Sequence, residues 1–267
     1  MRNLPWHSKL VLALLIFLPL YFAMAALGTK FGVWSWVTGL VSMIFTAGPI
    51  LLGIVAAIAL ISLLISFLRK PRRRAAIAIA VAGLVVPGVI FAGFLTARST
   101  AGDNPIHDVA TDTADPPQFS RRTMIARAEA EANPLHDYQT PLGELEMYEG
   151  SPPELAIKSH AQIINDIYAE LSPLPLGGAS QADGVAAVAA AMGNMGLTDI
   201  RSDAQSGLVE GVAETFWFGF EDDVVARVGP QQIDFRSVSR VGRSDLGVNA
   251  ARIAELRERT AQQIGQR

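Results

Sequence analysis

The chain has 267 residues, of which half are hydrophobic and only 18% are charged, and its mean hydropathy is +0.30. A soluble globular protein carries about 25% charged residues. Residues 1–97 contain eight Lys or Arg and no Asp or Glu, whereas residues 98–267 contain the other 14 basic residues and all 25 acidic ones. This division argues against a single globular domain, a disordered chain and a polybasic nucleic-acid binder.

The chain contains no cysteine. Disulfides, thiol nucleophiles, and zinc or iron–sulfur sites with cysteine ligands are therefore excluded together.

Residues 1–97 are predicted to form a membrane domain with three spanning helices. The spans are expected at about residues 10–29, 48–68 and 75–97, because each stretch is uncharged and has about the 20 residues that a crossing needs. Residues 31–47, with Trp34 and Trp36, are interpreted as an interfacial or re-entrant segment, since Trp favours the headgroup level. A fourth span there, and a cleaved signal peptide at 10–29, are the alternatives.

Orientation follows from a cationic loop. Five of the six residues at 69–74 are Lys or Arg, and each costs roughly 2.5–3.5 kcal/mol at the centre of a bilayer. This loop is expected to remain in the cytoplasm, with the N-terminus. Everything after Arg98 then lies outside the cytoplasm. The multi-pass domain contacts membrane lipids and has no charged residue within its spans, which argues against a transporter.

The outer part is divided into an extended leading segment, residues 98–150, and an α+β core, residues 151–267. The leading segment is predicted to contain a strand near 106–111 and a helix near 124–132. The motif Ser151-Pro152-Pro153-Glu154 resembles a capping box and predicts a long helix over about 151–171. A second helix is expected from Ser180 to about 193.

Strands are predicted over 208–218, 223–228 and 232–239, with a turn at 219–222. In the last strand, Ile233 and Phe235 share one face, and Asp234, Arg236 and Val238 share the other. A final helix is expected to begin at Asn249 as its N-cap. The order of elements predicts a small antiparallel sheet that is covered by helices on one face.

The run from Asp234 to Ala250, DFRSVSRVGRSDLGVNA, resembles the signature of the family of domain of unknown function 1499. The segment from Asn104 to Asp112, NPIHDVATD, resembles the start of the same domain, and FGFEDD at 218–223 resembles its middle. The resemblance covers about residues 100–265. It implies a bacterial or plastid family with no established activity, so it supplies no catalytic residues. In a bacterial cell, the expected location is then the inner membrane, with the N-terminus in the cytoplasm and the C-terminal domain in the periplasm.

One candidate binding site consists of Arg236, Arg240, Arg243 and the helix that begins near Asn249. Guanidinium groups and free N–H groups at a helix N-terminus both bind anions. The alternative is structural pairing of these arginines with Glu210, Glu214 and Asp245.

Two His-Asp pairs, His107-Asp108 and His136-Asp137, follow a repeated Asn-Pro and suggest a metal site. Adjacent residues on a strand point to opposite faces, however, which disfavours chelation by each pair. His160 is expected at a helix surface. Glu221-Asp222-Asp223 is interpreted as a solvated turn, with calcium binding as its alternative.

The preferred hypothesis is a non-enzymatic, membrane-tethered module outside the cytoplasm, with no cofactor, no metal and no nucleic-acid partner. It would recognise an envelope protein or an anionic envelope component. One alternative is a metal-assisted hydrolase of an envelope ester or phosphate that uses His107, Asp108 and Asp112. Another is a lipid-binding cavity lined by Phe216, Trp217 and Phe218, residues that are otherwise expected in the core.

Overall fold

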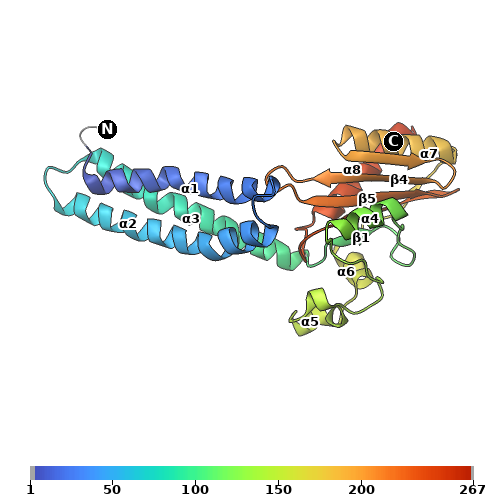
Figure 1. Cartoon of the computed structure of the whole chain (residues 1–267), viewed down its shortest axis with the longest axis horizontal. Coiled ribbons are helices and arrows are strands. Elements are labelled where there is room, and N and C mark those ends of the chain that lie inside the picture. The colour runs from blue at the N-terminus through green and yellow to red at the C-terminus, as the bar shows by residue number, and fades with distance from the viewer. Residues whose placement is uncertain (1–3, 266–267) are drawn as a thin grey trace. The chain divides into compact units, whose positions relative to one another are not determined.

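The computed structural model describes residues 4–265 and divides into two compact units (Figure 1). The helical unit contains the chain up to Ser99 together with Phe216–Gly219. The α+β unit contains Thr100–Thr215 and Phe220 onward.

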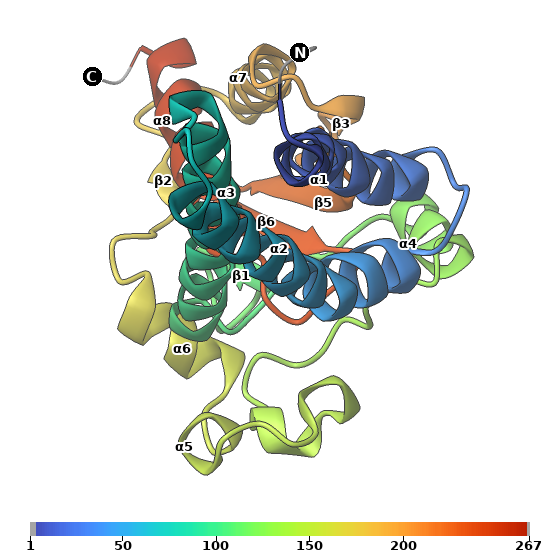
Figure 2. The ribbon, with the colours of Figure 1, turned by 90° about the vertical axis from the view of Figure 1, so that its left-hand side faces the viewer.

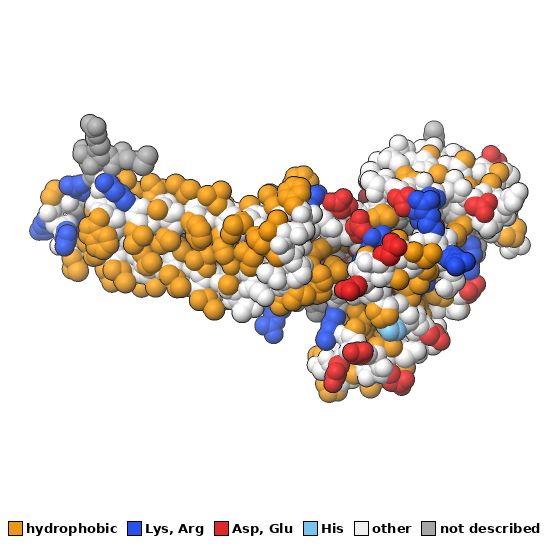
Figure 3. Space-filling model, viewed as in Figure 1, with side chains coloured by type: hydrophobic (Ala, Val, Ile, Leu, Met, Phe, Trp, Pro, Cys, Tyr) orange, Lys and Arg blue, Asp and Glu red, His pale blue; other side chains and the backbone are white. Residues whose placement is uncertain are grey.

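Three long apolar helices form the helical unit, as predicted: α1 (Trp6–Lys30), the helix formed by η1 (Val37–Ala47) and α2 (Gly48–Leu68), and α3 (Arg74–Asp103). Each is long and apolar enough to cross a membrane. Figures 1 and 2 show the three helices side by side, and Figure 3 shows hydrophobic side chains over much of the visible surface of this unit, with Lys and Arg at one end.

Small residues allow these helices to approach closely. A Cβ atom on Gly83 would lie 2.6 Å from both Val11 and Ala59, so only glycine fits there. Leu18, Leu52 and Val55 fill the adjacent interior. Close approach at small residues is how helices associate in lipid, where no hydrophobic force drives them together.

The interpretation of residues 31–47 as a re-entrant segment or a fourth span was wrong. Val37–Ala47 is a π-helix that continues directly into α2, so Val37–Leu68 is one helix of 32 residues. Pro49 lies inside this continuous helix, at the point where the π-helical turns give way to α2.

The α+β unit is built on one antiparallel sheet with the order β1-β6-β5-β4-β3. The short β2 also pairs with β6. The strands are β1 (Asp108–Ala110), β2 (Leu174–Pro175), β3 (Thr198–Asp203), β4 (Leu208–Glu214), β5 (Glu221–Val228) and β6 (Gln232–Ser239).

Two helices cover one face of the sheet, as expected. Val188 and Met192 of α7 (Gln181–Asn194) and Ile253 of α8 (Val248–Gln263) pack with Val224 and Phe235 in the main core. The opposite face is not open, however. Phe119, just before α4 (Arg121–Glu129), packs there against strand residues, and α4 makes ionic contacts with the sheet.

The long helix predicted over 151–171 is two short ones, α5 (Pro153–Ala156) and α6 (His160–Ile167). The capping box forms at Ser159 with Gln162 and not at Ser151. The backbone N–H of Leu142 donates to the carbonyl of Lys158, and this extended contact separates the two helices. The short 3₁₀ turns η2 (Leu142–Glu144) and η3 (Glu146–Tyr148) lie just before them.

Candidate functional site

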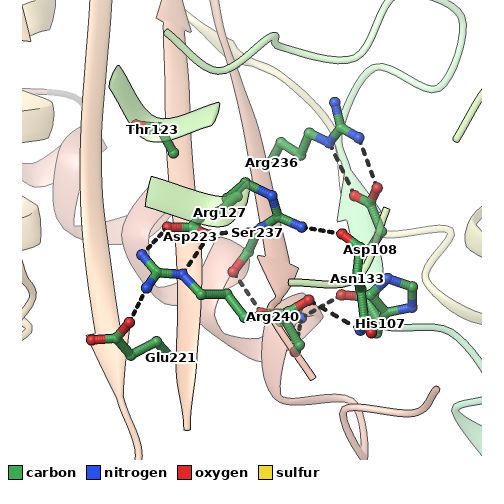
Figure 4. Close-up of polar contacts among 12 residues, drawn as sticks. His107, Asp108, Thr123, Arg127, Asn133, Glu221, Asp223, Arg236, Ser237 and Arg240 are labelled. Carbon is green, nitrogen blue, oxygen red and sulfur yellow. Dashed lines mark hydrogen bonds and ion pairs between the residues drawn. The ribbon is translucent and has the colours of Figure 1, made fainter. Parts of the chain in front are cut away.

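The sheet face opposite α7 and α8 carries buried ion pairs in a position where apolar residues are usual (Figure 4). Arg236 on β6 is 2% exposed and binds Asp108 of β1 through two parallel contacts, Nε–Oδ1 at 3.0 Å and Nη2–Oδ2 at 2.7 Å. Its Nη1 donates to the carbonyl of Pro117, and its guanidinium lies between the rings of Phe119 and Tyr138. Arg236 is therefore fully occupied by protein contacts.

A second buried group surrounds Asp223 on β5 (Figure 4). Asp223 accepts from Arg127 Nη1 at 2.6 Å, and from Arg240 Nε at 2.9 Å and Nη2 at 2.7 Å. Arg240 also pairs with Glu221. This group fixes α4 to the sheet, since Arg127 is a residue of that helix.

The predicted binding residues do not form one exposed site. Arg236 and Arg240 are paired, although with Asp108, Asp223 and Glu221 and not with the partners suggested from sequence. Glu210 instead accepts from Ser120 and pairs with Arg201. Of the four predicted residues, Arg236 and Asn249 are buried, Arg240 is half-buried and Arg243 is exposed.

Asn249 joins α8 to the sheet. It lies inside α8, whose N-cap is Gly247 and not Asn249 as predicted. Its Nδ2 donates to the carbonyl of His107 and to Ser239 Oγ, and its Oδ1 accepts from Ser237. The N–H groups of Gly247, the N-cap, and of Asn249 donate to the Asp245 carboxylate, which therefore occupies the position that an anionic ligand would take.

Next to Asp108 lies a cluster of aromatic and histidine side chains. Tyr138 donates a short hydrogen bond to Asp108 and stacks on His160, with 5.5 Å between ring centroids. His107 Nδ1 lies 3.2 Å from the Tyr148 hydroxyl, and the His107 and His160 rings are 6.3 Å apart. His160 is 1% exposed, so its expected place on a helix surface was wrong.

Burial controls the ionisation of this cluster. It lowers the pKa of His107 and of His160 to about 4, against a smaller opposing effect of Asp108, so both rings are neutral at pH 7. Burial alone would raise the pKa of Asp108, but the charge and hydrogen bonds of Arg236 outweigh it and lower that pKa. Burial also raises the pKa of Tyr138 and Tyr148.

Three buried imidazole nitrogens have no hydrogen-bond partner among the described residues: His107 Nε2, His136 Nε2 and His160 Nδ1. Buried polar atoms without partners are rare. Within residues 4–265, no three His, Asp or Glu side chains are placed to hold a metal ion. Asp112, assigned to the hydrolase alternative, pairs instead with Arg227.

Two further expectations were wrong. Glu221-Asp222-Asp223 is part of β5 and not a turn, and arginines neutralise these carboxylates. Phe216 and Trp217 neither line a cavity nor lie in the core, because they are 75% and 54% exposed in the turn that joins β4 to β5.

The 242–248 loop joins β6 to α8 and includes Val248, the first residue of α8. Leu246 is 46% exposed and has a φ of +60°, a left-handed conformation that a leucine rarely adopts. Ser244 holds the loop by donating to the carbonyl of Asn104 and accepting from the N–H of Leu246. Arg243 and Val248 are also exposed. No sequence pattern marked Leu246, since its backbone angle depends on the folded loop.

A comparison with protein-family models matches residues 108–259, more than half of the chain, to the family described as protein of unknown function (DUF1499). The resemblance noted from the sequence is thus confirmed. No curated protein and no solved structure matches the chain.

Proposed function

We propose, from the premise that this chain belongs to the DUF1499 family of proteins of unknown function, that it is a membrane-anchored binding module and not an enzyme. Its α+β unit lies outside the cytoplasm of a bacterial cell and uses the 242–248 loop to bind an envelope protein. Two sets of observations support the proposal, one for the anchoring and one for the binding.

The anchoring is supported by the three long apolar helices and by the cationic loop between α2 and α3. Lys and Arg near the ends of spans favour the cytoplasmic side. With this loop inside the cell, three crossings leave the N-terminus inside and the α+β unit in the periplasm.

The orientation can be tested directly because the chain has no cysteine of its own. Gln205, in the turn between β3 and β4, and Lys70, in the cationic loop, are both exposed. In intact spheroplasts, a membrane-impermeant maleimide is expected to label the Gln205→Cys variant at once. The Lys70→Cys variant should react only after the membrane is permeabilised. The reverse pattern of labelling would refute the proposed orientation.

The binding role is carried by one observation, the exposed Leu246 in a left-handed backbone conformation. Such a conformation costs roughly 1–3 kcal/mol for a residue other than glycine, and it persists where surrounding structure enforces it. In the free chain a half-exposed leucine regains little of this by packing. An apolar pocket on a partner would bury it, and Arg243, which is exposed in the same loop, would meet a carboxylate at the rim.

We expect that Leu246→Gly will abolish partner binding without destabilising the protein. Glycine removes the backbone strain, which is roughly 1–3 kcal/mol. This gain offsets the cost of glycine's greater conformational entropy in the unfolded chain, which is about 0.5–1 kcal/mol. A photoreactive residue at Val248 should give one dominant crosslinked protein in native membranes. That product should disappear in the Leu246→Gly and Arg243→Ala backgrounds, while urea unfolding shows the stability unchanged or raised.

A matched control is available in Ile157, which is 76% exposed directly after the separate helix α5. Ile157→Ser should leave the crosslink unchanged. If the crosslinked product persists in both loop variants, the 242–248 loop is not the binding surface.

A further inference from the structure

The turn between β4 and β5 ends in an exposed aromatic tip, which we define as Phe216, Trp217 and Phe218. Thr215 and Phe220 close the turn through two hydrogen bonds of 2.8 Å, from Thr215 N–H to the Phe220 carbonyl and from Phe220 N–H to Thr215 Oγ1. Phe216 and Trp217 are 75% and 54% exposed, and their rings meet edge to face at 5.2 Å. Large apolar side chains that are exposed together on a closed turn indicate a contact with an apolar surface of a protein or a membrane.

The aromatic tip packs with the helical unit, since its residues belong to that unit and not to the α+β unit. Lys30, the last residue of α1, donates from Nζ to the Phe216 carbonyl at 3.0 Å. The same ammonium lies 5.5 Å from the centre of the Phe216 ring. The tip is therefore held at the level at which α1 ends.

Other interfacial side chains cluster along the chain at this end of α1. Phe31 and Val33 are 73% and 69% exposed, and Trp34 and Trp36 follow directly. Aromatic rings next to a lysine at the end of an apolar helix are typical of the boundary between lipid headgroups and acyl chains. Phe216 and Trp217 extend this aromatic group from a distant part of the sequence.

We propose that the aromatic tip inserts into the outer headgroup boundary of the same membrane that the helices cross. The inference rests on the proposed membrane anchoring. The apolar face of a helix that lies in this boundary enters it by roughly 5–10 Å. Glu214 and Glu221, which face each other across the base of the turn, limit the depth, because carboxylates do not follow the rings into the acyl region.

The tip thus gives the α+β domain a second attachment to the lipid, in addition to its covalent link through α3. Two attachments restrict the domain more than the link through α3 alone does.

Fluorescence quenching tests this proposal in the full chain. The chain has four tryptophans. Replacing Trp6, Trp34 and Trp36 with Phe leaves Trp217 as the only emitter, and replacing Trp6, Trp36 and Trp217 with Phe leaves Trp34 as a matched control. Each variant is reconstituted in phosphatidylcholine vesicles that contain lipid brominated either near the top or near the bottom of its acyl chains.

We expect the Trp217 emission to be blue-shifted from its position in water. Its intensity should fall more with bromine near the top of the chains than near the bottom, and the Trp34 control should also lose intensity. Adding Phe216→Ser to the Trp217 variant should weaken the quenching and shift the emission toward the red. Circular dichroism spectra that match those of the unaltered chain establish that each variant is folded.

The two proposals fail in different ways. If brominated lipid quenches Trp34 but not Trp217, the aromatic tip does not insert, although the chain is anchored. If Trp217 is shielded from soluble acrylamide and brominated lipid still does not quench it, protein covers the tip and the lipid proposal is also overturned. If neither tryptophan is quenched, the membrane anchoring itself is wrong.

Discussion

Replacing Arg236 with leucine is expected to lower the free energy of unfolding by about 3–5 kcal/mol. Asp108 is only 3% exposed, and the substitution removes the bidentate partner of its carboxylate. It also removes the cation that lies between the Phe119 and Tyr138 rings. Urea unfolding of the full chain in detergent can be followed by the near-ultraviolet circular dichroism of tyrosine. Three of the four tyrosines, Tyr138, Tyr148 and Tyr168, belong to the α+β unit.

A double variant tests whether the loss of stability comes from the unpaired, buried charge of Asp108. Asn at position 108 keeps an acceptor for Tyr138 but carries no charge, so Asp108→Asn combined with Arg236→Leu should cost less than the sum of the two single changes, by roughly 0.5–3 kcal/mol. Arg259, which pairs with Glu255 on the surface of α8, is the matched control. Arg259→Leu should change stability by no more than about 0.5 kcal/mol. Strict additivity at 108 and 236 would show that the pair is not coupled.

The alternation of faces along β6 was predictable, whereas the partners of its arginines were not. Period-two patterning places Ile233 and Phe235 on one face and Arg236 on the other, and the structure has this arrangement. Asp108, however, is 128 residues away in sequence. Pairing at that distance depends on β1 lying antiparallel beside β6, and no local pattern specifies this neighbour.

Local signals also failed where tertiary contacts outweighed them. Glu221-Asp222-Asp223 has the composition of a turn. It becomes a strand because Arg240, Arg127 and Arg252 supply positive charge on both faces of β5. β3 was not predicted, because its sequence TDIRSD is polar and the strand is an exposed edge of the sheet.

The 151–171 region shows competition between two helix starts. Ser151-x-x-Glu154 and Ser159-x-x-Gln162 both fit the pattern of a capping box. The second forms, with both reciprocal hydrogen bonds, because residues 158 and 159 pair with the extended backbone at residues 141 and 142. Sequence periodicity ran through both segments and gave no sign of the break. The buried position of His160 follows from this break, since His160 is the first residue of α6.

Acidification from pH 7 to pH 5 is expected to destabilise the α+β unit strongly. His107 and His160 have a pKa of about 4 in the folded chain, and an unfolded histidine has a pKa of about 6.5. Between these values the unfolded chain binds more protons than the folded chain, so the free energy of unfolding falls as pH falls. At pH 5 the loss is about 2 kcal/mol for each of the two histidines. It begins below pH 6.5 and is complete below pH 4.

His136 contributes in the same direction, because burial lowers its pKa as well. The range from pH 7 to pH 5 lies above the range in which Asp108 titrates, since Arg236 lowers the pKa of Asp108 from its ordinary value near 3.8. The pH dependence between 7 and 5 therefore reports on histidines and not on the Asp108–Arg236 pair. Urea midpoints at pH 7, 6 and 5 measure the slope.

A variant that lacks one of the buried histidines separates this effect from general acid sensitivity. Gln at this position keeps a polar side chain of similar reach but does not titrate, so His160→Gln should lose up to about half of the slope between pH 7 and pH 5, whatever its stability at pH 7. Arg243→Ala, on the exposed loop, should keep the full slope. If stability is flat from pH 7 to pH 5, or if His160→Gln retains the whole slope, the imidazoles are not held neutral by burial. The three nitrogens without partners would then have to be hydrogen-bonded to water, because imidazoles with access to solvent titrate near their ordinary pKa.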